Sequence, residues 1–259
     1  MGVASVGILR LPAFGPYLIA SLAAYGLSLF LGVEPTRFTL AFPEVDPATL
    51  VRVGVLAALC AMLSVVFCEL LHHLEEALER RVPNAWLRAL AGGAALLALT
   101  LALGTRDYNG VGMEVIVRAV EQGSAVPSAF LWKMLFTAIT LSAGFKGGEV
   151  VPCFFIGATF GCVAGPLLGL DPRFAAAIGL VALFCGAVNC PLASTFLSIE
   201  LFGAEGMVYF AVACGLAYML SGYSGLYFSQ RILFDKLRAD YIDVRANAYH
   251  EGGFKRHSS

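Results

Sequence analysis

Seven long apolar stretches, separated by short polar pieces, dominate the pattern of hydrophobic and polar positions along this chain. A helix that crosses a bilayer needs about 20 mostly apolar residues, and each stretch has about that length. Charges inside them are rare, with Lys133 standing alone in the fourth. The pattern therefore predicts a bundle of membrane-spanning helices over residues 14–33, 53–71, 85–104, 129–145, 150–170, 174–199 and 207–230.

The polar pieces between these stretches predict loops and surface helices. Residues 33–52 contain three prolines and are typical of an interfacial loop. Residues 72–88 continue the second stretch as an amphipathic helix that leaves the membrane, because Glu76 and Arg80 are four residues apart on one face. Residues 105–127 predict a loop followed by a short surface helix.

Composition agrees with a polytopic protein of the cell membrane. Hydrophobic residues make up 59% of the chain and charged residues only 14%, whereas soluble domains carry about 25% charged residues. The chain therefore lacks the polar residues to coat a water-exposed surface. Its net charge of −1 argues against a nucleic-acid partner.

The charged C-terminal end predicts the orientation of the chain. From residue 231 onward there are six Lys and Arg against four Asp and Glu, and basic residues near the end of a span favour the cytoplasmic side. We therefore expect a transmembrane domain over 1–232 and a cytoplasmic tail over 233–259.

The seven cysteines lie scattered in apolar segments, and none forms a C-x-x-C pair. Free cysteine behaves as a small buried hydrophobe, so packing is expected rather than a metal or redox role. The residues are Cys60, Cys68, Cys153, Cys162, Cys185, Cys190 and Cys214.

A charged, glycine-rich break, GFKGGEVVP at 144–152, interrupts the apolar pattern. Pro152, and Pro191 further along, are expected in the first turns of helices that begin inside the membrane or at its edge. Broken helices at that depth are tolerated where they are buried or line a cavity, and their N-termini attract anions. A tight turn between packed helices is the simpler interpretation of the glycines, and a backbone anion cradle is the alternative.

Three segments resemble the CLC family of chloride channels and proton-coupled anion antiporters. SAGFKGGEVVPCFFIGATFGCVAG (142–165) is similar to the family segment that carries its G-x-x-x-P anion-binding motif. LFCGAVNCPLASTFLSIEL (183–201) and SGYSGLYFSQRI (221–232) are similar to the next two family segments, in the same order and spacing. GFKGGEV also resembles the bacterial branch that exports fluoride in exchange for protons.

The resemblance implies an all-α polytopic bundle with broken, re-entrant helices, and a halide site made mostly of backbone. The amides of Glu149 and Val150 would bind the anion, and the Tyr227 hydroxyl would donate to it. Without the resemblance, Tyr227 would be an interfacial aromatic anchor. Lys146 and Glu149 are expected as a charge pair at the mouth. The implied anion-binding set is Gly147, Gly148, Glu149, Val150, Val151, Pro152 and Tyr227.

The family's membrane domain contains two inverted repeats, and this chain resembles the second. The family's G-[KR]-E-G motif does not occur in it. We therefore expect an N-terminally truncated half of a CLC-type chloride channel or proton/anion antiporter. Its expected partners are chloride or fluoride, protons, lipid, and a second copy or a separate first half, with no cofactor. A split-transporter subunit and a non-transporting membrane fragment are the alternatives.

Other polar residues allow further interpretations. Glu149 is a candidate proton carrier, since membrane carboxylates are functional by default, although a structural or mouth-lining role is favoured because Lys146 lies nearby in sequence. Glu200 is expected to cap a helix or form an interfacial ion pair. His72 and His73 do not form an H-E-x-x-H pattern, so they predict a helix end at the interface and no metal site. A membrane enzyme is the weaker rival, since no nucleophile–base pair stands out.

Overall fold

The computed structural model describes residues 4–5, 8–9, 11–33, 36–227, 230–236 and 241–246. The chain divides into two compact units, one of Phe38–Leu226 and the other of Met1–Arg37 with Tyr227–Ser259. The larger unit is helical throughout its regular structure. Its elements are α2 (Pro47–Arg81), α3 (Ala85–Leu103), α4 (Met113–Gln122), α5 (Ala129–Ser142), α6 (Val150–Ala164), the 3-10 turn η1 (Pro166–Leu168), α7 (Pro172–Val188), α8 (Pro191–Phe202) and α9 (Met207–Leu220).

The smaller unit contains helix α1 (Leu11–Phe30) and two short antiparallel strand pairs. β1 (Ala4–Ser5) pairs with β2 (Ile8–Leu9), and β3 (Arg231–Phe234) pairs with β4 (Tyr241–Arg245). The sequence pattern did not predict these strands. The bundle is nevertheless helical in class, as expected, and residues 237–240 and 247–259 of the predicted tail lie outside the described residues.

Helix α7 forms the centre of the larger unit, where it contacts α2, α6, α8 and α9. Its closest neighbour is α6, because glycines remove the side chains between them. A Cβ atom on Gly157 would lie 2.3 Å from the carbonyl oxygen of Gly179, and one on Gly161 would lie 2.2 Å from that of Ala175. Such small-residue stripes let helix backbones approach closely in membranes.

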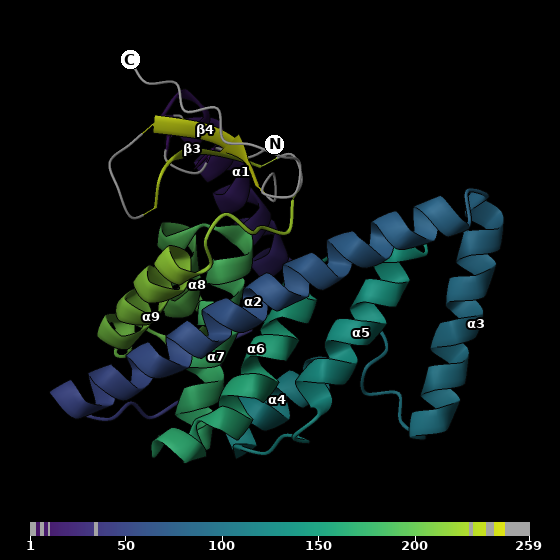
Figure 1. The fold of residues 1–259 in the computed structure, drawn as a ribbon. Coiled ribbons are helices and arrows are strands. Elements are labelled where there is room, and N and C mark those ends of the chain that lie inside the picture. Colours follow the sequence, from purple (N-terminus) through teal and green to yellow (C-terminus); the bar gives the residue numbers. More distant parts are fainter. Residues whose placement is uncertain are drawn as a thin grey trace. The chain divides into compact units, whose positions relative to one another are not determined.

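Helix α2 crosses α5, α6 and α7 and then extends beyond them toward α3 (Figure 1). It begins where the Asp46 carboxylate accepts hydrogen bonds from the amides of Ala48, at 2.6 Å, and Thr49, at 3.1 Å, with Pro47 in its first turn. Such a cap satisfies the free amides of a helix start. The loop predicted over 33–52 therefore ends at residue 46, earlier than expected.

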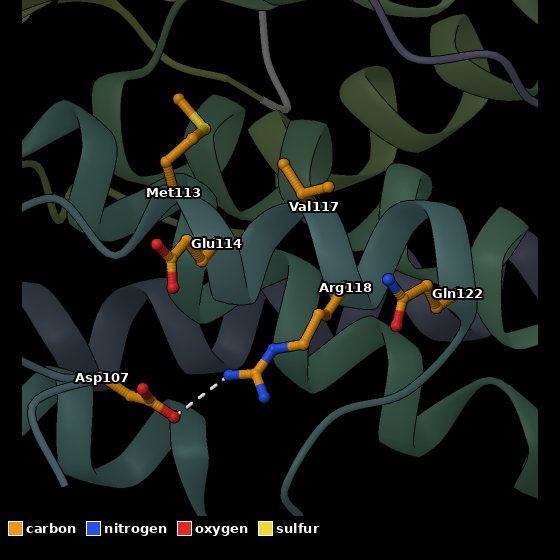
Figure 2. A pocket seen from close by; sticks show the side chains of 6 residues that line it. All are labelled: Asp107, Met113, Glu114, Val117, Arg118 and Gln122. Carbon is orange, nitrogen blue, oxygen red and sulfur yellow. Dashed lines mark hydrogen bonds and ion pairs between the residues drawn. The ribbon is translucent and has the colours of Figure 1, made fainter.

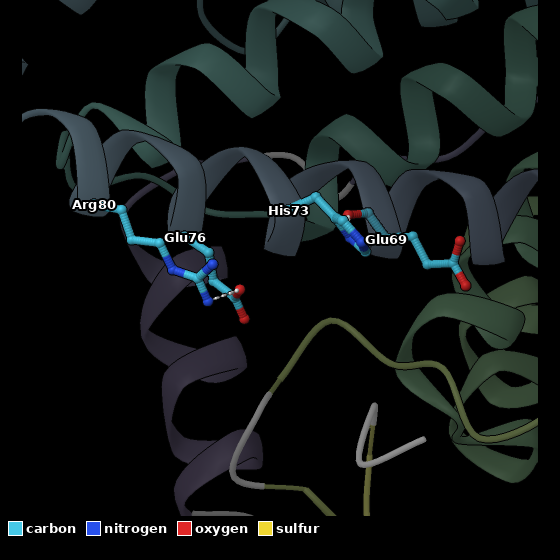
Figure 3. Close-up of polar contacts among 4 residues, drawn as sticks. All are labelled: Glu69, His73, Glu76 and Arg80. Carbon is cyan, nitrogen blue, oxygen red and sulfur yellow. Dashed lines mark hydrogen bonds and ion pairs between the residues drawn. The ribbon is translucent and has the colours of Figure 1, made fainter. Parts of the chain in front are cut away.

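The amphipathic extension predicted within residues 72–88 is present as the last turns of α2, which ends at Arg81, and residues 85–88 already belong to α3. Arg80 and Glu76 form an ion pair of 3.1 Å, and the His73 Nδ1 lies 2.9 Å from the Glu69 carbonyl oxygen. Figure 3 shows these four side chains along α2. The short helix expected within 105–127 is α4.

Two of the predicted long spans are divided in the structure. The stretch 174–199 separates at Asn189 and Cys190 into α7 and α8, because Asn189 adopts a left-handed conformation with φ of 60° and Pro191 opens a new helix. Within the stretch 150–170, the α-helix ends at Ala164, before Pro166. Pro152 and Pro191 occupy first turns, as predicted.

The resulting helices are short for a membrane. By length and composition, α2 and α3 are the two helices of the described part that could cross a bilayer alone. The 15 residues of α6 reach about 22 Å at 1.5 Å per residue, less than the roughly 30 Å of hydrocarbon. The apolar helices α5 to α9 are therefore too short to cross it alone.

Candidate anion site

The loop between α5 and α6 leaves its backbone open. Gly144 takes a φ of 90°, which favours glycine, and turns the chain after α5. A Cβ atom on Gly148 would meet no heavy atom within 4 Å among the described residues, and one on Gly147 would meet only Leu141, at 3.5 Å. Neither glycine has a positive φ. Packing and backbone strain therefore do not explain these two glycines, which leave access to the backbone instead.

The first turn of α6 presents amides without a side-chain cap. Glu149 is the N-cap residue and its carboxylate makes no capping hydrogen bond. The first intrahelical bond runs from the Cys153 amide to the Glu149 carbonyl oxygen, at 3.2 Å. Pro152 has no N–H, so the amides of Glu149, Val150 and Val151 are the donors at this helix start. Unpaired amides and the helix dipole together favour an anion here.

The charges beside the loop come chiefly from α2 and α3. The Arg88 Nη2 lies 3.8 Å from the position of a Cβ on Gly144, and Arg88 pairs with Glu79 at 3.3 Å. The Nε of Arg88 and the Oγ of Ser142 are buried polar atoms without hydrogen-bond partners. The ion pairs among the described residues do not include one between Lys146 and Glu149, so this mouth pair stays a prediction.

Tyr227 is the first residue of the smaller unit's C-terminal segment and is 39% exposed. The residues just before it are well anchored in the larger unit. The Leu226 amide donates to the Ala187 carbonyl oxygen at 3.0 Å, and the His72 Nε2 lies 3.3 Å from the Leu226 carbonyl oxygen. A Tyr227 hydroxyl beside the α6 amides stays a prediction.

Lys133 is among the most buried side chains, and the sequence pattern predicts no role for it. It lies in α5 at 1% exposure, where its ammonium donates to the carbonyl oxygens of Tyr108, at 3.2 Å, and Gly110, at 2.6 Å. A single charge within an apolar stretch was the available signal. Its backbone acceptors have no sequence signature.

A surface hollow lies elsewhere, along α4. Figure 2 shows its lining side chains, with Arg118 donating to the Asp107 carboxylate at 3.0 Å. The two charges neutralise each other and both are partly exposed. Arg118 is the basic residue among the lining residues and it is paired, so this hollow presents no unpaired cation to an anion. The lining residues are Asp107, Met113, Glu114, Val117, Arg118 and Gln122.

Comparison with known proteins places this chain in a family. The chain is 37% identical over 242 residues to the chloride/fluoride channel protein of Pseudomonas syringae pv. tomato, covering 89% of this chain and 52% of the relative. It is 24% identical over 171 residues to an uncharacterized protein of Methanocaldococcus jannaschii, covering 62% of this chain and 43% of that protein. The chain thus spans about half the length of the curated relatives it matches.

A solved structure has a similar fold. The crystal structure of a CLC-type fluoride/proton antiporter matches with a TM-score of 0.84 and 30% sequence identity, covering 88% of this chain and 58% of that one. The sequence model of the voltage gated chloride channel family matches residues 5–222. The chain therefore belongs to the voltage gated chloride channel family, as its glycine-rich break and its two later segments predicted.

Proposed function

We propose that this chain forms one half of a halide transport unit in which the first turn of α6 binds the permeant anion. The observation that carries the proposal is the uncapped start of α6, where the amides of Glu149, Val150 and Val151 follow an exposed glycine loop. Backbone donors of this kind replace part of an anion's hydration shell. Gly147 and Gly148 give the ion access.

The ion is a halide, chloride or fluoride. The names of the relatives support both, since one is a chloride/fluoride channel and the other a fluoride/proton antiporter. The Tyr227 hydroxyl is the second donor, and Lys146 and Glu149 line the mouth. The transport unit exchanges the halide for protons. This chain acts in the cell membrane as a multi-pass protein.

The assembly includes a second half. Because the chain spans about half of its relatives, the α6 amides form one wall of the site and a facing wall comes from a further repeat. The complete unit is a homodimer, with a transmembrane domain over 1–232 and a cytoplasmic tail from residue 233.

Ion efflux from liposomes tests this function. Fluoride and chloride efflux is measured for this chain alone and for this chain co-expressed with the part of the Pseudomonas relative that it does not match. We expect halide flux from the combined halves and loss of that flux with Val150→Pro. Absence of flux in every combination refutes the proposal.

A non-transporting membrane subunit is the second candidate, favoured by the same half-length match. It predicts that the chain binds the complementary half without binding halide. Isothermal titration of the combined halves with fluoride and chloride separates the two candidates, because a transport unit binds the ion and an assembly subunit does not.

A further inference from the structure

Lys133 carries a buried charge that no ion pair cancels. Its side chain is 1% exposed, and no carboxylate among the described residues lies within 4.0 Å of its nitrogen. Its partners are the carbonyl oxygens of Tyr108 and Gly110 and the ring of Phe155, whose centroid lies 5.0 Å from the ammonium nitrogen. These groups stabilise an ammonium through dipoles and the ring quadrupole, and they leave its net charge in place.

This arrangement is costly if its purpose is only to hold a loop. Burying a charge without a counterion carries a large desolvation penalty, whereas a neutral amide side chain could donate to the same two carbonyl oxygens. Ionisable groups inside membrane bundles are rare and mark functional pathways. The buried charge of Lys133 therefore indicates a functional role beyond holding the loop.

Phe155 connects the Lys133 ammonium to α6, the helix whose first turn is proposed to bind the anion. It is the sixth residue of α6, so its Cα lies about 7.5 Å along the axis from that of Val150, and helical side chains lean toward the N-terminus. The ring is held in place from the loop side, because a Cβ on Gly112 would lie 2.7 Å from it and the Tyr108 ring centroid is 6.3 Å away. The 5.0 Å from the ammonium nitrogen to this ring, added to the rise along α6, puts the ammonium on the order of 10 Å from the free amides.

We propose that Lys133 is an electrostatic positioning residue that raises the affinity of the α6 amides for a halide without touching the ion. The inference rests on the proposed function of α6. A unit charge at about 10 Å, in the effective dielectric of a protein interior, changes an ion's binding constant roughly tenfold. The alternative is that Lys133 only holds the loop of Tyr108 and Gly110 in place. Replacing it would then lower the stability of the fold and leave halide affinity unaltered.

Calorimetric titration of the combined halves with sodium fluoride and sodium chloride, alongside thermal unfolding of each variant, distinguishes these roles. We expect Lys133→Gln to weaken halide binding about tenfold and Lys133→Arg to restore most of it. Arg52→Gln is the matched control, because the Arg52 Nη1 also donates to a backbone carbonyl, that of Gly169 at 3.2 Å, but from an exposed position. Its halide affinity should equal that of the wild type.

A second variant keeps the test decisive if Lys133→Gln does not fold. Lys133→Met also removes the charge and keeps an unbranched side chain of similar length. It should weaken halide binding to the same extent as Lys133→Gln. Unchanged affinity in a variant whose unfolding temperature falls, or equal losses for Lys133→Gln and Lys133→Arg, overturns the role of the charge. Absence of halide binding by the wild type instead refutes the proposed function, and this proposal falls with it.

Discussion

The contact between α6 and α7 predicts a strong dependence on single glycines. A Cβ atom on Gly161 would lie 2.2 Å from the Ala175 carbonyl oxygen, 2.9 Å from its carbonyl carbon and 3.2 Å from the Ala176 Cα. All three are backbone atoms, so no side chain can rotate away. The oxygen contact alone is about 1 Å shorter than carbon–oxygen van der Waals separation, and the helices must therefore separate to admit a methyl group.

We expect Gly161→Ala to lower the free energy of unfolding by about 1–3 kcal/mol, the usual cost of overpacking. Gly215→Ala in α9 is the matched control, because a Cβ atom there meets no heavy atom within 4 Å. That substitution should stabilise the helix by about 0.5–1 kcal/mol through the lower backbone entropy of alanine. Thermal unfolding in detergent, followed by circular dichroism, measures both. Equal unfolding temperatures for the two variants would refute the packing argument.

Three further substitutions test the site and the helix ends. Val150→Pro removes one of the α6 amides, so halide affinity should fall about tenfold or more, as a lost bond to a charged group predicts. Glu149 before it has φ of −86° and ψ of −18°, a conformation that a following proline disfavours, so a loss of stability is also expected, and thermal unfolding measures it separately. Tyr227→Phe should also weaken halide binding, and unchanged calorimetric affinity would exclude its hydroxyl. The Thr49 hydroxyl and amide hold the pKa of Asp46 below its usual 3.8, so its stabilisation is present at neutral pH and lost as pH falls through the lowered pKa. Asp46→Asn should flatten that acid dependence in unfolding measured between pH 3 and pH 7, and an unaltered slope would contradict it.

The sequence predicted the helix starts better than the helix lengths. Pro152 and Pro191 marked first turns correctly, because proline acts through its own φ and its missing N–H. The apolar stretch 174–199 divides where Pro191 predicted a helix start, although hydrophobicity alone does not reveal that Asn189 is left-handed. The strands β3 and β4 were missed, because their few residues lie in a charged segment and pair across a gap of sequence.

Close packing and backbone sites are harder to predict for a physical reason. The spacing of Gly157 and Gly161 is visible in the sequence, but their partner carbonyl groups on α7 carry no residue-type signal. The same holds for Lys133, whose acceptors are backbone oxygens of the loop before α4. Interactions made by main-chain atoms emerge when the helices are placed in space.

In an anion site made of backbone amides, the positions of the donors are fixed by the placement of the helix and not by side-chain conformations. The free amides at the start of α6 are directed along the helix axis. Their positions are therefore fixed by the packing of α6 against its neighbours. The glycines facing α7 allow backbone contact at van der Waals distance and limit the movement of that axis. Substitutions along this contact should therefore alter halide affinity in proportion to the loss of stability they cause, whereas neutralising Lys133 should reduce affinity beyond any loss of stability.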